Sequence, residues 1–244
     1  METFSRVKLL IGQEKFNKIQ SSSVAVFGIG GVGGFVAESL IRSGVCELDL
    51  FDSDKVSMSN LNRQIVATVD TVGKDKVDAM KSRLLSINPN ATIKVNKVFY
   101  LPENADDIDL TKYDYIVDAI DTVSAKIELI SRAKKFNVPI ISCMGTGGKL
   151  DPQMLKVADI EKTKGCPLAR VMRRELKLRN IRDVKVVYSE EQTIIDQGQK
   201  INAEKTNSGR IVPPSMIFVP ACAGILIARE VVFDIANGID GEKK

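Results

Sequence analysis

Histidine is missing from the 244-residue sequence, and this absence removes several kinds of chemistry. Without an imidazole, the chain can use neither His-based acid–base catalysis nor a His-ligated metal site. Cysteine is scarce as well: the set is Cys46, Cys143, Cys166 and Cys222, and no two of them form a C-x-x-C pair. We therefore expect no tetrahedral zinc–thiolate site.

The sequence also lacks a recognisable secretory signal and a long apolar run. The first 20 residues are charged and contain no apolar core of the kind that a signal peptide needs. The longest apolar run, Ile217–Ala228, is too short to cross a bilayer, so we expect no transmembrane segment and interpret the run as part of a core helix. These absences favour a reduced, cytoplasmic setting. The net charge of +4 does not by itself demand a polyanionic partner.

A glycine-rich turn stands at the centre of the sequence pattern. The β-forming run Val24–Phe27 leads directly into Gly28, Gly30 and Gly33, which have the G-x-G-x-x-G spacing, and a helical pattern follows at 35–42. In this strand–loop–helix context the glycines allow a tight turn, a close approach of backbone to phosphate, and close packing of helix on strand. The helix N-terminus then directs N–H groups at an anion, so the turn predicts a nucleotide-phosphate site.

Strand and helix patterns alternate through the first 150 residues. We expect strands at 24–27, 47–52, 91–98, 115–120 and 138–143, with further strands at 154–160 and 184–189. We expect helices at 6–18, 35–42, 72–85, 124–137 and 220–237, the last one stopped by Gly238. This alternation predicts an α/β fold with a doubly wound, Rossmann-like and mostly parallel sheet.

We interpret residues 1–244 as a single domain with three parts. A helical arm at 1–20 precedes a nucleotide-binding core at 21–150, and a C-terminal extension of mixed strands and helices occupies 151–244. Within the extension, residues 197–210 are polar and aperiodic, which predicts a mobile loop.

Acidic and amide side chains follow the second predicted strand. Asp52 ends that strand, where a nucleotide-binding fold places the carboxylate that binds the ribose hydroxyls of ATP or NAD alike. The segment Ser57–Gln64 then concentrates Asn, Arg and Gln, which an ordinary NAD dehydrogenase does not need. Arginine and amide donors can instead stabilise the charge that develops when a phosphoanhydride breaks. Lys76 could serve the same purpose, although taken alone it is more simply a solvated lysine.

Two aspartates, Asp118 and Asp121, lie near the end of the fourth predicted strand. Because the carboxyl ends of parallel strands meet at the ligand crevice, a carboxylate there can reach a magnesium ion that bridges phosphates. Asp121 lies further toward the loop and is the better metal candidate. Asp118 is the better candidate for holding backbone N–H groups.

A basic helix and one cysteine leave alternatives open. At 3.6 residues per turn one face carries the basic residues Arg170, Arg173, Arg174 and Lys177, and the other carries Leu168, Val171, Met172 and Leu176. A solvated helix face explains the basic residues at least as simply as a nucleic-acid contact. Cys166 lies in a Gly-Cys-Pro turn near these cations and could be reactive, whereas the other three cysteines read as core residues.

The combination of GIGGVGG, LDLFDSDKVSMSNLNRQ, VGKDKV and DAIDT resembles the ubiquitin-activating-type adenylating enzymes, over about residues 6–148. The resemblance implies a homodimer that binds ATP and Mg²⁺. It implies that Arg63, Lys76 and Asp121 are catalytic, and that Asp121 holds the metal. The nucleotide-binding positions that it implies, or that lie in the matching motifs, are Gly28, Gly30, Gly31, Gly33, Asp52, Asp54, Ser59, Asn60, Arg63, Gln64, Lys76 and Asp121. Arg6 matches an arginine that reaches into the partner's site.

The remaining chain resembles one branch of that family, on the segments 167–176, 187–191 and 217–221. Members of this branch adenylate the threonyl carboxylate of threonylcarbamoyladenosine at the anticodon loop of tRNA and close it to a cyclic form with release of AMP. The resemblance thus implies tRNA as partner, with Arg170, Arg173, Arg174 and Lys177 against its backbone and region 151–244 serving the substrate and the dimer. A need for a monovalent cation and a sulfur-transfer (cysteine desulfurase) partner stay open.

Three other functions remain as alternatives. The first is adenylation of the C-terminal glycine of a small sulfur-carrier protein, against which the missing cysteine pairs count. The second is a non-catalytic nucleotide sensor or scaffold. The third is an NAD oxidoreductase, for which no hydride-handling acid–base group can be named.

Overall fold

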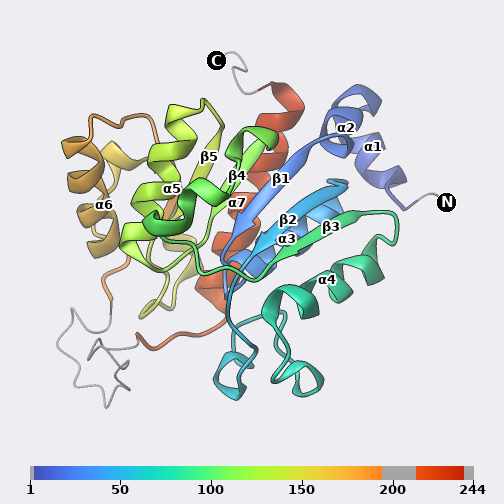
Figure 1. Cartoon of the computed structure of the whole chain (residues 1–244), viewed down its shortest axis with the longest axis horizontal. Helices are drawn as coiled ribbons and strands as arrows, with labels where there is room; N and C mark the ends of the chain where they lie inside the picture. Colours follow the sequence, from blue (N-terminus) through green and yellow to red (C-terminus); the bar gives the residue numbers. More distant parts are fainter. Residues whose placement is uncertain (1–2, 194–212, 239–244) are drawn as a thin grey trace.

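The computed structural model of the chain describes residues 3–193 and 213–238, and the predicted mobile loop at 197–210 lies outside them. The described chain is built on one sheet with the strand order β3-β2-β1-β4-β5-β7-β6 (Figure 1). All neighbouring strands are parallel except β6 and β7, which pair antiparallel. The predicted α/β class and the mostly parallel sheet are confirmed, and the extension adds its two strands to the same sheet.

The strands are short, and helices connect several of them in chain order. The strands are β1 (Ser23–Phe27), β2 (Glu47–Phe51), β3 (Thr92–Asn96), β4 (Tyr115–Asp118), β5 (Ile140–Cys143), β6 (Leu155–Asp159) and β7 (Lys185–Ser189). The α-helices are α1 (Ser5–Ile11), α2 (Gln13–Gln20), α3 (Gly33–Ser43), α4 (Lys76–Ile87), α5 (Val123–Lys135), α6 (Pro167–Leu178) and α7 (Phe218–Asn237).

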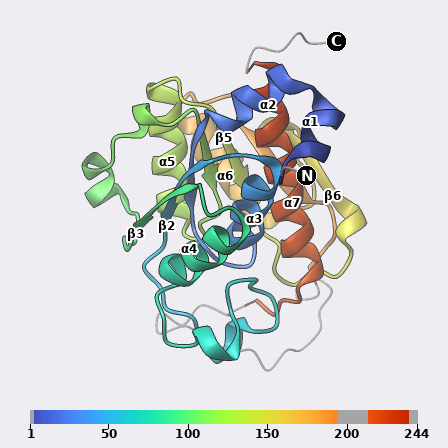
Figure 2. The same ribbon diagram turned by 90° about the vertical axis from the view of Figure 1, so that its right-hand side faces the viewer.

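Alternate residues of each strand enter two separate hydrophobic cores. Val24 and Val26 of β1 pack with residues of α3, α4 and α7 on one face of the sheet. Ala25 and Phe27 pack with residues of α5 and α6 on the other face. Because successive side chains of a strand point to opposite faces, a sheet covered on both sides needs apolar residues at every position. The result is the three-layer arrangement seen in Figures 1 and 2.

Helix α7 is the long core helix predicted from the run 217–228. It packs on α3 so closely that a Cβ on Gly224 would lie 2.6 Å from the carbonyl oxygen of Val32. Gly238 ends the helix at φ +80°, as the sequence predicted. Among the described helices, none has the length and apolarity needed to cross a membrane.

Two helices break or begin differently from the prediction, in each case at a glycine. The expected arm helix at 6–18 is two helices, because Gly12 adopts φ +86° between them. The expected helix at 72–85 begins only at Lys76, because Gly73 adopts φ +85° and turns the chain first. A left-handed glycine is incompatible with a continuous helix.

The strand order reverses between β1 and β4, which creates the crevice where α/β sheets bind ligands. Directly beneath this crevice lies an ion pair between Asp118, at the end of β4, and Lys126 of α5. The two charged atoms are 2.9 Å apart and both side chains are fully buried. Asp118 also accepts hydrogen bonds from the Ser142 hydroxyl at 2.6 Å and the Ile120 amide at 3.2 Å, and Lys126 donates to the Ile120 carbonyl at 3.1 Å. The pair thereby holds the turn that leads to Asp121.

Replacing Lys126 by methionine should destabilise the protein strongly, since it leaves the Asp118 carboxylate buried without its counter-ion. We expect a decrease of about 3–5 kcal/mol in the free energy of unfolding, measured by urea denaturation. The double variant Asp118→Asn with Lys126→Met removes both charges and should recover part of that decrease. Equal stability of Lys126→Met and the native chain would contradict a stabilising role for the pair.

Candidate nucleotide-binding site

The glycine turn after β1 forms one wall of a cavity of about 700 Å³ at the crevice. Gly28 adopts φ +90°, and a Cβ there would lie 2.6 Å from the carbonyl oxygen of Ala119 on the loop after β4. A Cβ on Gly33 would lie only 1.7 Å from the carbonyl oxygen of Gly28. Side chains are therefore excluded at both positions, and the backbone of the turn is exposed to the cavity at Gly30 and Gly31.

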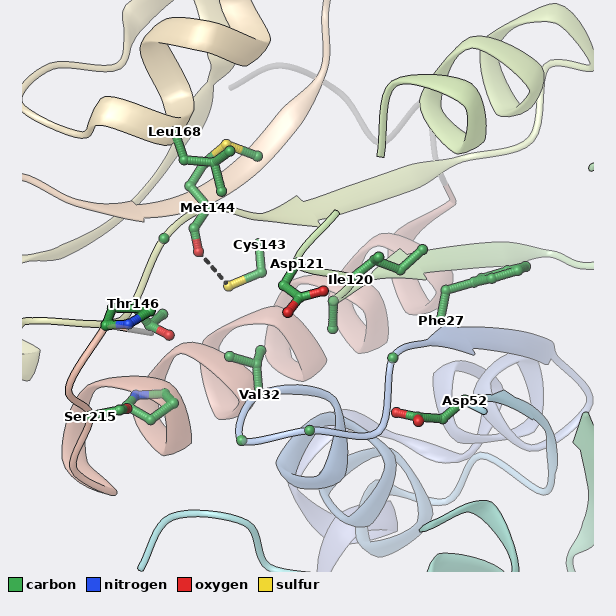
Figure 3. A pocket seen from close by; sticks show the side chains of 18 of the residues that line it. Phe27, Val32, Asp52, Ile120, Asp121, Cys143, Met144, Thr146, Leu168 and Ser215 are labelled. Atoms are coloured by element: carbon green, nitrogen blue, oxygen red, sulfur yellow. Dashed lines mark hydrogen bonds between the residues drawn. The ribbon is translucent and has the colours of Figure 1, made fainter. Parts of the chain in front are cut away.

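Asp52 fastens the glycine turn to the end of β2. One carboxylate oxygen accepts the Ile29 amide at 2.7 Å, and the other accepts the Asp54 amide at 2.8 Å. Burial raises the pKa of Asp52, while the charge of Lys76, 3.8 Å away, opposes that shift. Asp52 lines the cavity and faces the glycine turn (Figure 3), which is the position predicted for a ribose-binding carboxylate.

Lys76 is buried rather than solvated, with 6% of its surface exposed. Its ammonium donates to a carboxylate oxygen of Asp54 at 2.7 Å and lies between the two aspartates. The simpler interpretation of a solvated lysine is therefore wrong. The first residue of α4 carries a cation into the cavity because the turn at Gly73 delays the helix until that point.

The polar segment Ser57–Gln64 borders the same cavity. Asn60, Arg63 and Gln64 all line it, next to the glycine turn. The Arg63 guanidinium donates to the Ser59 carbonyl at 2.7 Å, which directs the side chain along the segment. Gln64 is 7% exposed, and among the described residues its side-chain oxygen has no hydrogen-bond partner.

Ser59 differs from its neighbours because it does not line the cavity. Its hydroxyl lies 2.9 Å from the hydroxyl of Ser57, and its carbonyl supports Arg63. The serine therefore acts on the cavity only through the backbone, whereas the sequence predicted a direct nucleotide contact.

Asp121 lies between the two halves of the cavity, with its exposed carboxylate directed inward (Figure 3). Within the described residues, no group of three or more His, Cys, Asp or Glu side chains could hold a metal ion by itself. Magnesium usually takes one or two carboxylates together with phosphate oxygens and water. A single carboxylate beside a phosphate-binding wall fits that mode of binding.

The far half of the cavity was not predicted from the sequence. It is formed by the loop after β5, the start of α6 and the segment before α7, and its lining includes Met144, Thr146, Leu168 and Ser215 (Figure 3). Lys149 lines the cavity as well. The segment before α7 is held in place by the Asn62 side-chain amide, which donates to the Ser215 carbonyl at 2.9 Å. The only signal in the sequence was the run GTGGK, which follows the fifth predicted strand.

The cysteines near the cavity are poorly suited to nucleophilic chemistry. Cys143 is buried, and burial raises the pKa of its thiol to about 12. Cys166 is the N-cap of α6 and is only 4% exposed, which does not favour the reactive thiol that its turn had suggested. Cys46 and Cys222 are half-buried rather than full core residues.

Helix α6 presents a smaller basic face than the sequence pattern indicated. Arg170, Arg174 and Lys177 are exposed, but Arg173 turns inward and its guanidinium donates to the Thr163 carbonyl at 2.7 Å and hydroxyl at 2.8 Å. The apolar face also differs: Val171 is 37% exposed. The buried side of the helix consists of Ala169, Met172 and Leu176. Arg173 therefore stabilises the fold rather than the basic face.

Arg6 does not join the cavity of its own chain. It is exposed on α1, and α2 lies at the C-terminal end of α7, where the Lys15 ammonium donates to the Asn237 side chain at 2.8 Å (Figures 1 and 2). The cavity borders the opposite end of α7 at Pro220. From Pro220 to Asn237 the helix spans about 25 Å, at about 1.5 Å per residue.

Three features meet at the point where the strand order reverses. They are a glycine turn at a helix N-terminus, the carboxylate of Asp52 at the end of the neighbouring strand, and the polar segment Ser57–Gln64. This arrangement defines the class of nucleotide-binding α/β proteins. The sequence profile of the ThiF family matches residues 4–236. The chain belongs to the ThiF family.

Known proteins of this kind match the chain along nearly its whole length. A relative from Bacillus subtilis (strain 168), named tRNA threonylcarbamoyladenosine dehydratase, is 39% identical over 246 residues, which cover 98% of this chain and 97% of the relative. Two crystal structures of E. coli tRNA N6-threonylcarbamoyladenosine dehydratase, one with AMP and one with ATP, each give a TM-score of 0.85. They are 30% and 29% identical to this chain, and each match covers 96% of this chain and 93% of the other. The family resemblance expected from the sequence is confirmed.

The packing of the glycine turn predicts that substitutions at Gly33 and Gly30 differ in their effect on stability. Gly33→Ala would place a Cβ 1.7 Å from a backbone oxygen, so we expect a decrease of about 3 kcal/mol or more in the free energy of unfolding. Gly30→Ala meets no atom closer than 3.9 Å, so its stability should stay close to that of the native chain.

Gly30→Ala should nevertheless weaken ATP binding at least tenfold in titration calorimetry, because its methyl group would stand where the backbone meets the phosphates. Native-like ATP affinity in Gly30→Ala would argue that the phosphates lie elsewhere.

Proposed function

We propose that the chain catalyses the ATP-dependent dehydration of threonylcarbamoyladenosine at the anticodon loop of tRNA. One observation carries this proposal: Asn60, Arg63, Gln64 and Lys76 reach the same cavity as the glycine turn and Asp121. A bound nucleoside triphosphate would then have donors along its phosphates and open space on its far side for an acceptor. The near-full-length similarity to proteins named for this reaction supports the choice of acceptor.

The reaction needs activation because a carboxylate is a poor electrophile. A threonyl carboxylate oxygen attacks the α-phosphorus of ATP, and the bond to pyrophosphate breaks, which leaves a mixed anhydride with AMP. The ureido nitrogen of the same nucleoside then attacks the acyl carbon, loses its proton, and releases AMP as the ring closes. The tRNA nucleoside loses one water in total, and the carboxylate oxygen that is lost ends in AMP.

The near wall of the cavity, formed by the glycine turn, Asp52, the segment Ser57–Gln64 and Lys76, would serve the first of these steps. Arg63 and Lys76 would stabilise the charge on the phosphate oxygens, and the preorganised amide of Gln64 would add a donor. Asp52 would bind the ribose hydroxyls. Asp121 would hold magnesium, which neutralises phosphate charge when bound.

The exposed part of α6 would contact the tRNA backbone. Arg170, Arg174 and Lys177 are exposed on a helix whose N-terminus borders the far half of the cavity. Arginine and lysine on one helix face suit phosphate contacts, which position a nucleic acid without reading its sequence. Arg173 is left out of this surface because it is bound to Thr163.

We further propose a homodimer in which Arg6 of one copy reaches the cavity of the other. Arg6 does not line the cavity of its own chain, and α2, which follows its helix, contacts the end of α7 that is remote from that cavity. We therefore assign its contribution to the cavity of the partner. Sedimentation should show a dimer in solution, and Arg6→Ala should lower the rate of AMP release without breaking that dimer. A monomer with full activity would contradict this arrangement.

Incubation of the purified protein with ATP, Mg²⁺ and tRNA that carries threonylcarbamoyladenosine tests the proposed function. Mass spectrometry of the nucleosides should show the loss of one water, with AMP and pyrophosphate released in equal amounts. Pyrophosphate exchange that responds to a small sulfur-carrier protein, and not to this tRNA, would favour the alternative acceptor. An unchanged nucleoside despite ATP binding would contradict the proposal.

Removing the near-wall cations should slow the chemical step more than it weakens tRNA binding. Arg63→Ala and Lys76→Met should each lower kcat by about 100–1000-fold, the usual cost of removing one transition-state donor. Arg42→Ala, which breaks an ion pair with Glu38 outside the cavity, is the matched control and should keep native kcat. The measurement is AMP release under saturating tRNA, and native kcat in Arg63→Ala would exclude its catalytic role.

The basic face of α6 predicts a defined salt dependence. Replacing Arg170, Arg174 and Lys177 by alanine should reduce the slope of log affinity against log salt by about 0.7–0.9 for each phosphate that is no longer neutralised. Lys18→Ala on α2, which removes an exposed lysine paired with Glu14, should leave the slope unchanged. Filter binding with the native tRNA over a range of salt concentrations gives both slopes. An unchanged slope in the triple variant would place the tRNA on another surface.

A further inference from the structure

The cavity spans the carboxyl ends of four neighbouring strands, from β2 across β1 and β4 to β5. The glycine turn and Asp52 lie at one side, and Met144, Thr146 and Leu168 lie at the other, with Asp121 between them (Figure 3). The near half has the features expected for a nucleotide. The far half is where an acceptor would meet the phosphates.

Cations are unevenly placed along this cavity. Of the described residues that line it, Arg63, Lys76 and Lys149 are cationic. Arg63 and Lys76 lie on the near wall beside the glycine turn. Lys149 lies in the far half, after the loop that follows β5, and it supplies the positive charge of that wall among the described lining residues.

Lys149 is built firmly into its position. It is only 3% exposed, and its ammonium donates to the backbone carbonyl of Ser189 at 2.9 Å. Ser189 is fully buried at the end of β7, so this acceptor is part of the rigid sheet.

We propose that Lys149 binds the carboxylate of the acceptor and so makes the far half of the cavity specific for acidic substrates. This inference rests on the proposed function, because it assigns the acceptor to this half. A carboxylate brought up to a triphosphate is repelled by it, and a cation on the acceptor side offsets that repulsion.

The surroundings of Lys149 strengthen such a contact. Met144, Leu168 and Val171 give the far half an apolar wall. An apolar wall lowers the local dielectric, so a charge pair there is stronger than in water. It also keeps water from a mixed anhydride, which would otherwise be hydrolysed. When the carboxylate becomes an acyl phosphate it loses its charge, so its attraction to Lys149 weakens at the stage when the ring must close.

The test compares two tRNAs that differ in the acceptor group: one with threonylcarbamoyladenosine and one with unmodified adenosine at the same position. The native protein, in the presence of a non-hydrolysable ATP analogue, should bind the modified tRNA more tightly. Lys149→Met should remove about 10–100-fold of this preference, the usual range for a hydrogen-bonded charge contact. Its affinity for the unmodified tRNA and for the ATP analogue should stay native.

Lys149→Gln, which keeps a hydrogen-bond donor without charge, guards against a variant that merely fails to fold. It should likewise raise KM for the modified tRNA while its melting temperature stays native. Lys156→Met, which replaces an exposed lysine on β6 paired with Glu190, is the matched control. It should change neither the KM for the modified tRNA nor the melting temperature. A preference for modified tRNA that survives in both Lys149 variants would overturn the inference.

The outcomes separate this inference from the function on which it rests. If the native protein forms no cyclic nucleoside, the proposed function fails and the acceptor site fails with it. If the native protein is active and the Lys149 variants lose ATP affinity and both tRNA affinities equally, Lys149 has only a structural role, and only this inference is overturned.

Discussion

The site depends on backbone packed against backbone where β1, β4 and α3 meet. Gly33 touches the carbonyl of Gly28, and Gly28 touches the carbonyl of Ala119, at distances that leave no room for a Cβ. Because no side chain intervenes, the ends of two central strands and the start of a helix converge on one point. A phosphate chain can therefore reach main-chain N–H groups directly, and every other site residue is arranged around that point.

Charge is distributed in layers around this packed turn. The buried pair of Asp118 and Lys126 is neutral as a unit and lies beneath the crevice, where it fixes the turn that carries Asp121. Above it, Lys76 lies between two aspartates, so the near wall holds a cation without a large net charge. Lys149 supplies a positive charge to the opposite wall. Such a layout suits a reaction in which two anions must be brought into contact.

Local patterns predicted much of the fold and of the near wall. Apolar runs that end in glycine or acid located β1, β2 and β4, and the switch point of a doubly wound sheet then placed Asp52, Asn60, Arg63 and Gln64 around one cavity. Helix periodicity identified the basic side chains of α6 but could not show that Arg173 turns inward. That orientation depends on Thr163, which belongs to the loop before the helix.

The far wall could not be predicted because it is made of contacts between distant parts of the chain. Asn62 reaches the Ser215 carbonyl across 153 residues, and Lys149 reaches the Ser189 carbonyl across 40. Neither contact leaves a local spacing that reports it. The burial of Lys76 was missed for a similar reason, since its partners Asp52 and Asp54 lie in the preceding crossover.

The central claim is that an acceptor carboxylate attacks the α-phosphorus of ATP in this cavity, and isotope transfer tests it most directly. With tRNA whose threonyl carboxylate carries a heavy oxygen label, one labelled oxygen should appear in AMP after a single turnover. Label found in inorganic phosphate, or kept entirely in the nucleoside, would contradict the account.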